Sequence, residues 1–227
     1  MSQIWVWERY FEGSSSTDFI GSVLYRPDAV AKIGKASLDL NRLAYEIVAL
    51  QNEIPEVGIV YSDADIILKP EAIKASYEAY AASLYNGKTV RFITDLNPAA
   101  MQNYKLVVVP GTRHISAEML NELSKYVTNG GKVIVMGKDA DILSMNKTSD
   151  AHDKNVVDHI INNSVVIDYK GTESAVLGIQ PPEICKVVRD ELINAGAYYI
   201  SVIDASTCEP AYGIEYNIGV NDDKVIV

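Results

Sequence analysis

Short, continuous apolar runs alternate along this chain with longer stretches in which apolar residues recur every three or four positions. Such runs are typical of strands covered on both faces, and they predict strands over residues 57–61, 89–94, 106–109, 132–136, 165–167 and 198–203. The periodic stretches predict helices between these strands. We therefore expect an α/β fold, a flavodoxin-like three-layer α/β/α sandwich with a mostly parallel sheet.

The pattern is clearest over residues 104–139. A buried strand is followed by a helix with Ser116 as its N-cap and Gly130 and Gly131 at its end, and then by a second buried strand. The helix is expected to bury five apolar side chains: Met119, Leu120, Leu123, Tyr126 and Val127.

Three further helices are predicted by the same periodicity. A helix that begins near Pro27 and ends before Pro55 has one apolar face, formed by Ala36, Leu40, Leu43, Ile47 and Leu50. A second helix covers residues 69–86, and its apolar face holds Ile73, Tyr77, Tyr80, Ala81 and Leu84. A third helix runs from Pro181 to Gly196, with its inward positions at Ile184, Val187, Val188 and Leu192.

The chain divides into three regions on this pattern. Residues 1–55 combine a short aromatic strand with the first helix, residues 56–205 carry the alternating strands and helices, and residues 206–227 end in a β-hairpin with a turn at Asn221 to Asp223. The link over residues 95–104 is short for a crossover between parallel strands, so the strand order is left open there.

Composition and charge narrow the classes of function. The chain has 227 residues, of which 48% are hydrophobic and 22% charged, and its net charge is -10. A chain this acidic does not offer the basic surface that non-specific nucleic-acid binding needs, and its apolar runs are too short to cross a membrane. Binding of a neutral ligand, such as a sugar, stays open.

Cys185 and Cys208 form neither a Cys-x-x-Cys pair nor a metal-ligand cluster. We interpret them as two structural thiols in a reducing compartment, although a disulfide between them is left open. Without a visible signal peptide, the chain is weakly favoured to be cytoplasmic. Both ends of the chain are strand-like, however, so we expect it to be a fragment of a longer protein, whose location a missing signal does not decide.

Four segments carry candidate chemistry, and each also has a structural interpretation. Gly137-Lys138-Asp139 lies where an α/β enzyme would carry a nucleophile at a sharp turn, but it contains neither serine nor cysteine. In Gly111 to His114 the histidine is a candidate base and Arg113 a candidate anion clamp, yet no acidic residue follows to orient the histidine. This segment is alternatively a polar loop before the Ser116 cap.

The two other segments are Ser62 to Asp65 and the helix start at Cys185. Asp63 and Asp65 are possible Mg²⁺ ligands, or they belong to a turn and helix cap. Cys185 lies near a helix N-terminus, where a thiol can become reactive, but it is also next to Ile184 on the apolar face and is more simply a packed thiol. No cofactor or metal ion is expected from these patterns.

Trp5 to Arg9 is the most functional-looking segment. In a strand Trp5 and Trp7 point to one side and Glu8 to the other, which would suit a sugar cleft at the end of a barrel strand; the alternative is a strand that packs two tryptophans into a core. Glycoside hydrolysis needs two carboxylates across the scissile bond, and this segment offers at most one.

Six segments taken together resemble the later part of family 42-like β-galactosidases: residues 5–9 (WVWER), 26–29 (RPDA), 38–48 (LDLNRLAYEIV), 57–62 (VGIVYS), 104–111 (YKLVVVPG) and 127–137 (VTNGGKVIVMG). The resemblance implies that residues 1–55 are the last strand and helix of a (β/α)8 barrel. Residues 56–205 would be the trimerisation domain, similar in fold to class I glutamine amidotransferases, and residues 206–227 the start of a C-terminal β domain.

The resemblance also implies that the catalytic glutamates lie on earlier barrel strands, so no catalytic residue is assigned here, while Trp7 and Glu8 match the sugar site of the last strand. The sequence thus predicts a non-catalytic accessory and homo-oligomerisation domain, a trimer in the parent protein, in which carbohydrate binds to the missing barrel.

Two alternatives remain at this point. A free-standing amidotransferase- or peptidase-like enzyme would need Cys185 or Cys208 beside His114, His152 or His159. A flavodoxin-like binding module would hold phosphate or flavin in the loops after the first or third strand of the sheet.

Overall fold

The computed structural model describes residues 27–68, 72–137, 154–169, 182–197, 200–221 and 224–227. Two compact units, Met1–Asn52 and Glu53–Val227, make up the chain. The strand expected at Ile4 to Trp7 lies outside the described residues.

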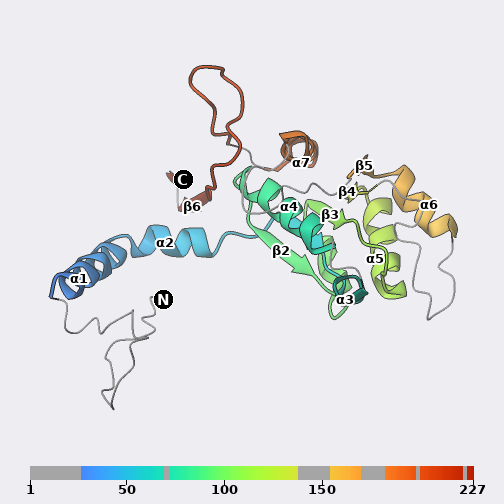
Figure 1. Cartoon of the computed structure of the whole chain (residues 1–227), viewed down its shortest axis with the longest axis horizontal. Helices are drawn as coiled ribbons and strands as arrows, with labels where there is room; N and C mark the ends of the chain where they lie inside the picture. The colour runs from blue at the N-terminus through green and yellow to red at the C-terminus, as the bar shows by residue number, and fades with distance from the viewer. Residues whose placement is uncertain (1–26, 69–71, 138–153, 170–181, 198–199, 222–223) are drawn as a thin grey trace, which may run out of the picture. The chain divides into compact units, whose positions relative to one another are not determined.

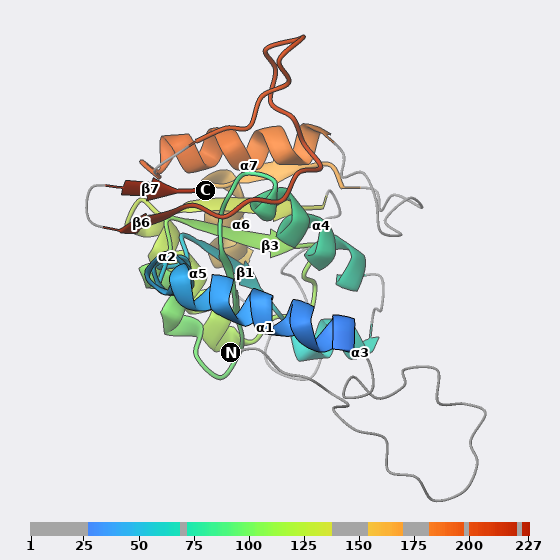
Figure 2. The same cartoon turned by 90° about the vertical axis from the view of Figure 1, so that its left-hand side faces the viewer.

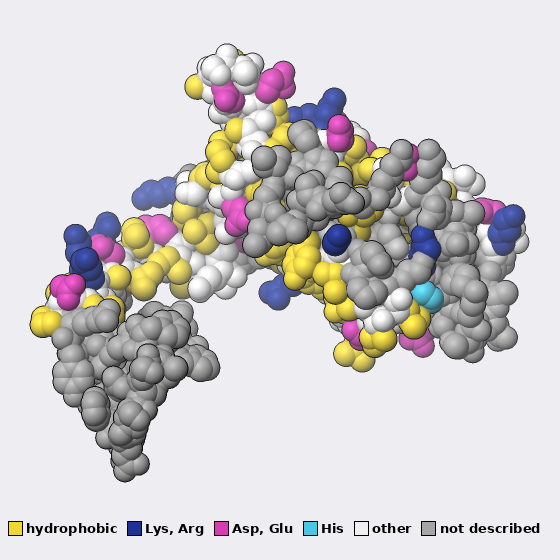
Figure 3. Space-filling view, viewed as in Figure 1, with side chains coloured by type: hydrophobic (Ala, Val, Ile, Leu, Met, Phe, Trp, Pro, Cys, Tyr) yellow, Lys and Arg dark blue, Asp and Glu magenta, His cyan; other side chains and the backbone are white. Residues whose placement is uncertain are grey.

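The first unit contains the helix that the sequence predicts from Pro27. It appears as α1 (Pro27–Arg42) and α2 (Ala44–Gln51). Backbone hydrogen bonds from Leu43 N to Asp39 O (3.0 Å) and from Ile47 N to Leu43 O (2.9 Å) continue the helical pattern across the junction. Neither helix has a buried residue, and exposed apolar side chains line both of them (Figure 3).

The second unit is built on a five-stranded sheet in the order β2 (Val90–Ile93), β1 (Val57–Val60), β3 (Leu106–Pro110), β4 (Lys132–Met136) and β5 (Val165–Ile167) (Figure 1). All neighbouring strands are parallel. This is the flavodoxin-like order, in which the connection changes direction between β1 and β3. The predicted α/β sandwich is thus confirmed.

Helices cover both faces of this sheet (Figure 2). On one face α5 (Ala117–Thr128), α6 (Lys154–Asn162) and the 3-10 helix η2 (Pro98–Asn103) pack against Val107, Val109, Val133 and Val135. On the other face α4 (Ala72–Leu84) and α7 (Pro182–Asn194) pack against Leu106, Val108, Ile134 and Met136. Successive strand residues alternate between the two cores, which explains why the runs are continuously apolar.

The short link between β2 and β3 does act as a crossover, because β3 lies beyond β1 from β2. It contains η2, which rises more per residue than an α-helix and so spans the distance with few residues. Met101 of η2 is fully buried in the core.

The prediction for α5 is confirmed in detail. The Ser116 hydroxyl accepts a hydrogen bond from Met119 N (3.2 Å), and the five predicted side chains are all buried. Gly130 has φ 87°, which a residue without Cβ adopts at little cost, and Gly131 N donates to Tyr126 O (2.9 Å) to close the helix end.

Two predictions need correction. Residues 200–203 of the last predicted strand form no strand, and only Ile203 pairs, in an isolated bridge with Pro210; residues 198–199 lie outside the described part. The segment from Asp63, expected to be a loop or turn, forms the short helix α3 (Asp63–Leu68), and α6 was not predicted at all. The C-terminal hairpin, β6 (Gly219–Asn221) with β7 (Lys224–Ile226), is confirmed.

Candidate functional site

The loops that follow β1 and β3 meet at the switch point of the sheet. Because parallel strands end at the same edge, the segment from Ser62 and the segment from Gly111 come together although they are about fifty residues apart. This is the place where flavodoxin-like folds bind ligands or carry reactive groups.

Asp65 is the centre of this contact and is only 2% exposed. Its carboxylate accepts hydrogen bonds from Arg113 N at 2.7 Å and His114 N at 2.9 Å. The same carboxylate lies 2.7 Å from Nδ1 of the His114 ring. A carboxylate is an acceptor, so Nδ1 of His114 is the donor in this pair.

Ser62 closes the network from the other side. Its hydroxyl donates to the backbone oxygen of His114 and accepts a hydrogen bond from Asp65 N (3.3 Å), which makes Ser62 the cap of α3. The hydroxyl of Ser62 therefore connects the two loops as well as holding the helix start. The cap interpretation of Ser62 to Asp65 is confirmed.

No acidic residue follows His114 locally, but Asp65 from the preceding loop of the switch point holds it. A buried carboxylate that holds an imidazole through Nδ1 is the arrangement that the acid and base of a hydrolytic triad also have. Local sequence could not reveal this partner, because the acid lies 49 positions away in the loop after β1. The signal that would have found it is the strand order, which brings these two loops together.

A nucleophilic thiol is not beside this pair. Cys185 lies on the core-facing side of α7, and burial raises the pKa of its thiol to about 12, which confirms a packed cysteine. Cys208 is exposed in the turn after Asp204, and the two cysteines are free rather than joined in a disulfide. His159 instead lies 3.2 Å from Thr128 Oγ1, and His152 is outside the described residues.

The other predicted site residues are only partly visible. Gly137, with φ 141°, follows β4 and donates its N–H to Ile167 O (2.8 Å), while Lys138 and Asp139 lie outside the described residues. Trp7 and Glu8 also lie outside them. Within the described ranges no group of three or more His, Cys, Asp or Glu side chains could hold a metal ion, and no helix has the length and apolarity to span a membrane.

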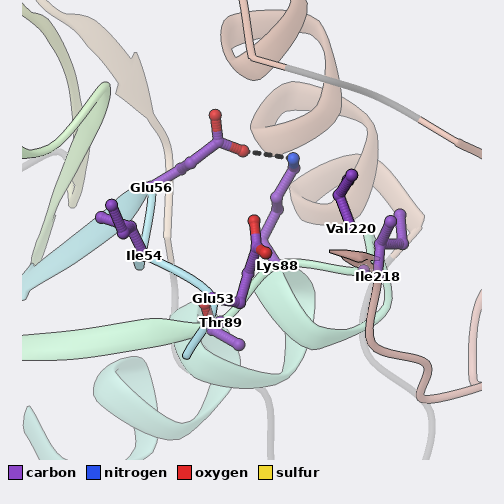
Figure 4. Close-up of a pocket in the computed structure, with 8 residues that line it drawn as sticks. Glu53, Ile54, Glu56, Lys88, Thr89, Ile218 and Val220 are labelled. Atoms are coloured by element: carbon purple, nitrogen blue, oxygen red, sulfur yellow. Dashed lines mark hydrogen bonds and ion pairs between the residues drawn. The ribbon is translucent and has the colours of Figure 1, made fainter. Parts of the chain in front are cut away.

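A small hollow lies at the opposite, amino-terminal edge of the sheet and has a volume of about 90 Å³ (Figure 4). Glu56 and Lys88, both among its lining residues, form an ion pair, and the second oxygen of Glu56 lies 2.6 Å from Lys105 Nζ. Burial alone would raise the pKa of the Glu56 carboxyl, but hydrogen bonds and charge from Lys105 and Lys88 outweigh burial and hold the pKa below its ordinary value.

A shallower groove of about 360 Å³ lies at the same edge, near the starts of β3 and β4. It is lined by polar and aromatic side chains that include Gln102, Tyr104, Tyr126, Asn129 and Lys132. Neither hollow includes the residues of the switch point, so the oriented Asp65–His114 pair and the hollows are separate features.

A scan against protein families finds no match, and a search of curated proteins finds none. Among solved structures, the chain is similar to the apo form of a GH42 exo-carrageenase from Bacteroides ovatus, with 18% sequence identity and a TM-score of 0.66. The match covers 97% of this chain and 28% of the exo-carrageenase chain, so this chain spans little more than a quarter of that protein. A match to Gan42B, a GH42 β-galactosidase, has 21% identity over 38% of this chain and 14% of that one, and its TM-score of 0.32 is too low to bear on the fold.

Proposed function

We propose that this chain is a non-catalytic accessory and oligomerisation region of a GH42-type glycoside hydrolase that acts on β-galactosides. The observation that carries the proposal is the structural likeness over 97% of the chain to a GH42 exo-carrageenase that is several times longer. In such a protein the catalytic residues would lie on barrel strands outside the matched region, and this chain would support them through assembly.

The first unit supports this division between a catalytic barrel and an assembly region. Leu40 and Leu43 of the predicted apolar face are exposed, and α1 and α2 have no buried residue. An amphipathic helix of this kind is stabilised mainly by packing its apolar face against another surface. We propose that residues 1–55 belong to the end of a barrel, where Trp7 and Glu8 would line the sugar site.

The arrangement at the switch point also supports a structural role. Ser62, Asp65 and the backbone of His114 bond one another, and this network fixes the two loops that would otherwise form a ligand crevice. A loop pair held in this way is stiff, and stiffness suits a domain that presents its outer surfaces to other subunits. We propose that residues 56–205 form the trimerisation domain and that residues 206–227 begin a further β domain.

The oriented Asp65–His114 pair favours one alternative, a hydrolase of the amidotransferase or peptidase type. Such an enzyme would need a serine or cysteine in reach of His114 Nε2. Labelling of the intact chain with a fluorophosphonate and with iodoacetamide separates the two functions. Stoichiometric labelling that is lost in His114→Ala would favour the hydrolase and count against the accessory role.

Two measurements on the purified chain test the main proposal. Light scattering after size-exclusion chromatography is expected to give three times the mass of one chain. Incubation with an aryl β-galactoside is expected to release no phenol above the level of buffer, because a single region without the paired carboxylates cannot cleave the bond. Steady hydrolysis by the chain alone would overturn the non-catalytic role, and a single-chain mass at all concentrations would overturn the oligomerisation role.

A further inference from the structure

The groove of about 360 Å³ at the amino-terminal edge of the sheet lies where helices α5 and α7 end and strands β3 and β4 begin. Its volume is within the range of small-ligand sites, about 300–1,000 Å³. We name it the edge groove. Its polar and charged side chains come from four different elements and their flanks: Gln102, Lys105, Asn129, Lys132 and Asn194.

Two tyrosines form the apolar part of the edge groove. Tyr126 is only 4% exposed, and its hydroxyl donates a hydrogen bond to Tyr104 O (2.9 Å). A Cβ at Gly131 would lie 2.4 Å from the Tyr126 ring, so glycine at this position allows the ring to lie beneath the groove. Small-ligand sites typically combine such aromatic surface with a few polar groups that fix the orientation of the ligand.

The amide side chains give the edge groove both donors and acceptors. Gln102 Nε2 donates to Glu122 O at 3.3 Å, and Asn194 Nδ2 donates to Glu191 Oε1 at 2.9 Å. These bonds orient the two amides and leave their oxygens as acceptors. The Asn129 side chain makes no hydrogen bond within the described part of the chain. A ligand with several hydroxyl groups can use all three amides.

The edge groove is locally basic in an acidic chain. Lys105 and Lys132 are its charged lining residues, and no Asp or Glu is among the described residues that line it. Lys105 shares the carboxylate of Glu56 with Lys88, so two ammonium groups face one carboxylate beside the groove. Lys132 is partly buried and has no ion-pair partner in the ranges that the structure describes. A partly buried ammonium of this kind favours an anionic group in the ligand.

The helix ends limit the charge that the edge groove can accept. The last carbonyl groups of α5 and α7 have no partners inside their own helices, and the helix dipoles give these ends a partial negative charge. Such carbonyls accept hydrogen bonds from hydroxyl groups but repel a small ion with several negative charges. The groove therefore suits a polyhydroxylated ring with a single anionic substituent better than it suits phosphate.

We propose that the edge groove binds a galactose unit that carries one anionic group, such as a sulfate ester. The anionic group pairs with Lys132, and the sugar hydroxyls bond to the amides and to the carbonyls at the helix ends. This inference rests on the proposed function for the identity of the sugar. It adds a second carbohydrate site that lies outside the catalytic barrel.

The test is calorimetric titration of the intact chain with three probes: galactose 6-sulfate, galactose and inorganic sulfate. Lys132→Gln removes the unpaired charge, and Asn129→Ala removes an exposed amide from the lining. Lys186→Gln is the matched control, because Lys186 is exposed on α7 and is not a lining residue. Far-ultraviolet circular dichroism verifies that all three variants are folded.

We expect galactose 6-sulfate to bind the wild-type chain and to bind Lys132→Gln about tenfold more weakly, since one charge-assisted hydrogen bond is lost. Asn129→Ala should weaken it by a smaller factor, and Lys186→Gln should leave it unchanged. Galactose should bind more weakly than its sulfate ester.

Three results would overturn the proposal: equal binding of inorganic sulfate and galactose 6-sulfate, binding that Lys132→Gln and Asn129→Ala both retain in full, or no binding of galactose 6-sulfate. Each would leave the oligomerisation role standing, because light scattering measures that role independently. A single-chain mass together with binding that both groove variants weaken would instead overturn the oligomerisation role and support the edge groove.

Discussion

The charge network around Glu56 makes a quantitative prediction about stability. Glu56 faces two lysines, of which Lys88 has a side chain only 7% exposed and Lys105 one that is 43% exposed. Glu56→Gln keeps the shape of the side chain and removes its charge. The buried Lys88 ammonium then loses the carboxylate that offsets its desolvation, while Lys105 can turn toward water.

The size of the effect follows from this asymmetry. Removing one partner of a buried ion pair costs about 3–5 kcal/mol, whereas an exposed pair contributes about 0–1 kcal/mol. The retained amide oxygen can still accept a hydrogen bond, so we expect Glu56→Gln to lower the free energy of unfolding at neutral pH by about 3 kcal/mol. Lys88→Met should cost less, because Glu56 keeps its contact with Lys105 at 2.6 Å.

The same network predicts how stability depends on pH. The pKa of Glu56 is lowered in the folded chain, so its contribution is fully present above the unfolded pKa of about 4.5 and is lost as the pH falls through the folded pKa. The difference in unfolding free energy between wild type and Glu56→Gln should therefore shrink below that pH. Urea unfolding followed by circular dichroism measures both quantities. Equal stabilities at neutral pH, or a difference that stays constant on acidification, would refute the reasoning.

Two further substitutions test other parts of the structure. Gly87 has φ 65°, and an added Cβ would lie 2.3 Å from the Tyr216 ring, whereas Gly196 has φ 69° and open space around it. Gly196→Ala should therefore lower the unfolding free energy by about 1–2 kcal/mol, and Gly87→Ala should lower it by clearly more. Urea titration of both variants measures the difference. Asp65→Asn replaces a buried carboxylate that accepts hydrogen bonds from two backbone N–H groups, so it should lower the unfolding free energy by about 2–3 kcal/mol. Hydrogen exchange of the His114 amide should become faster. An unchanged exchange rate would contradict the role of Asp65 in joining the two loops.

Local patterns were sufficient where one element contains its own signals. In α5 the cap, the five buried side chains and the glycine stop all come from neighbouring residues, and the structure has each of them where the sequence places it. The continuous apolar strands likewise follow from burial on both faces, which any sequence can display. Residues 200–203 show the limit, since β-rich composition alone does not supply a neighbouring strand to pair with.

Relations between distant residues were not accessible in the same way. Asp65 and His114 lie 49 positions apart, and only the strand order β2-β1-β3 brings their loops together. The packing of α4 was not predictable for a related reason: periodicity shows that a helix has two faces, but the sheet beneath decides which residues are buried. Ala75, Ala79 and Ala82 of α4 pack in the core, while Tyr77 and Tyr80 are left exposed.

The sequence by itself determined the α/β class, the positions of most helices and strands, and the caps that delimit α5, because these depend on the hydrophobic period and on backbone groups a few residues apart. Only the tertiary structure decided that an acid orients His114, that Glu56 joins two lysines and that Tyr77 and Phe92 face outward. These depend on which strands become neighbours and how closely helices pack, and both are properties of the whole chain rather than of any one segment.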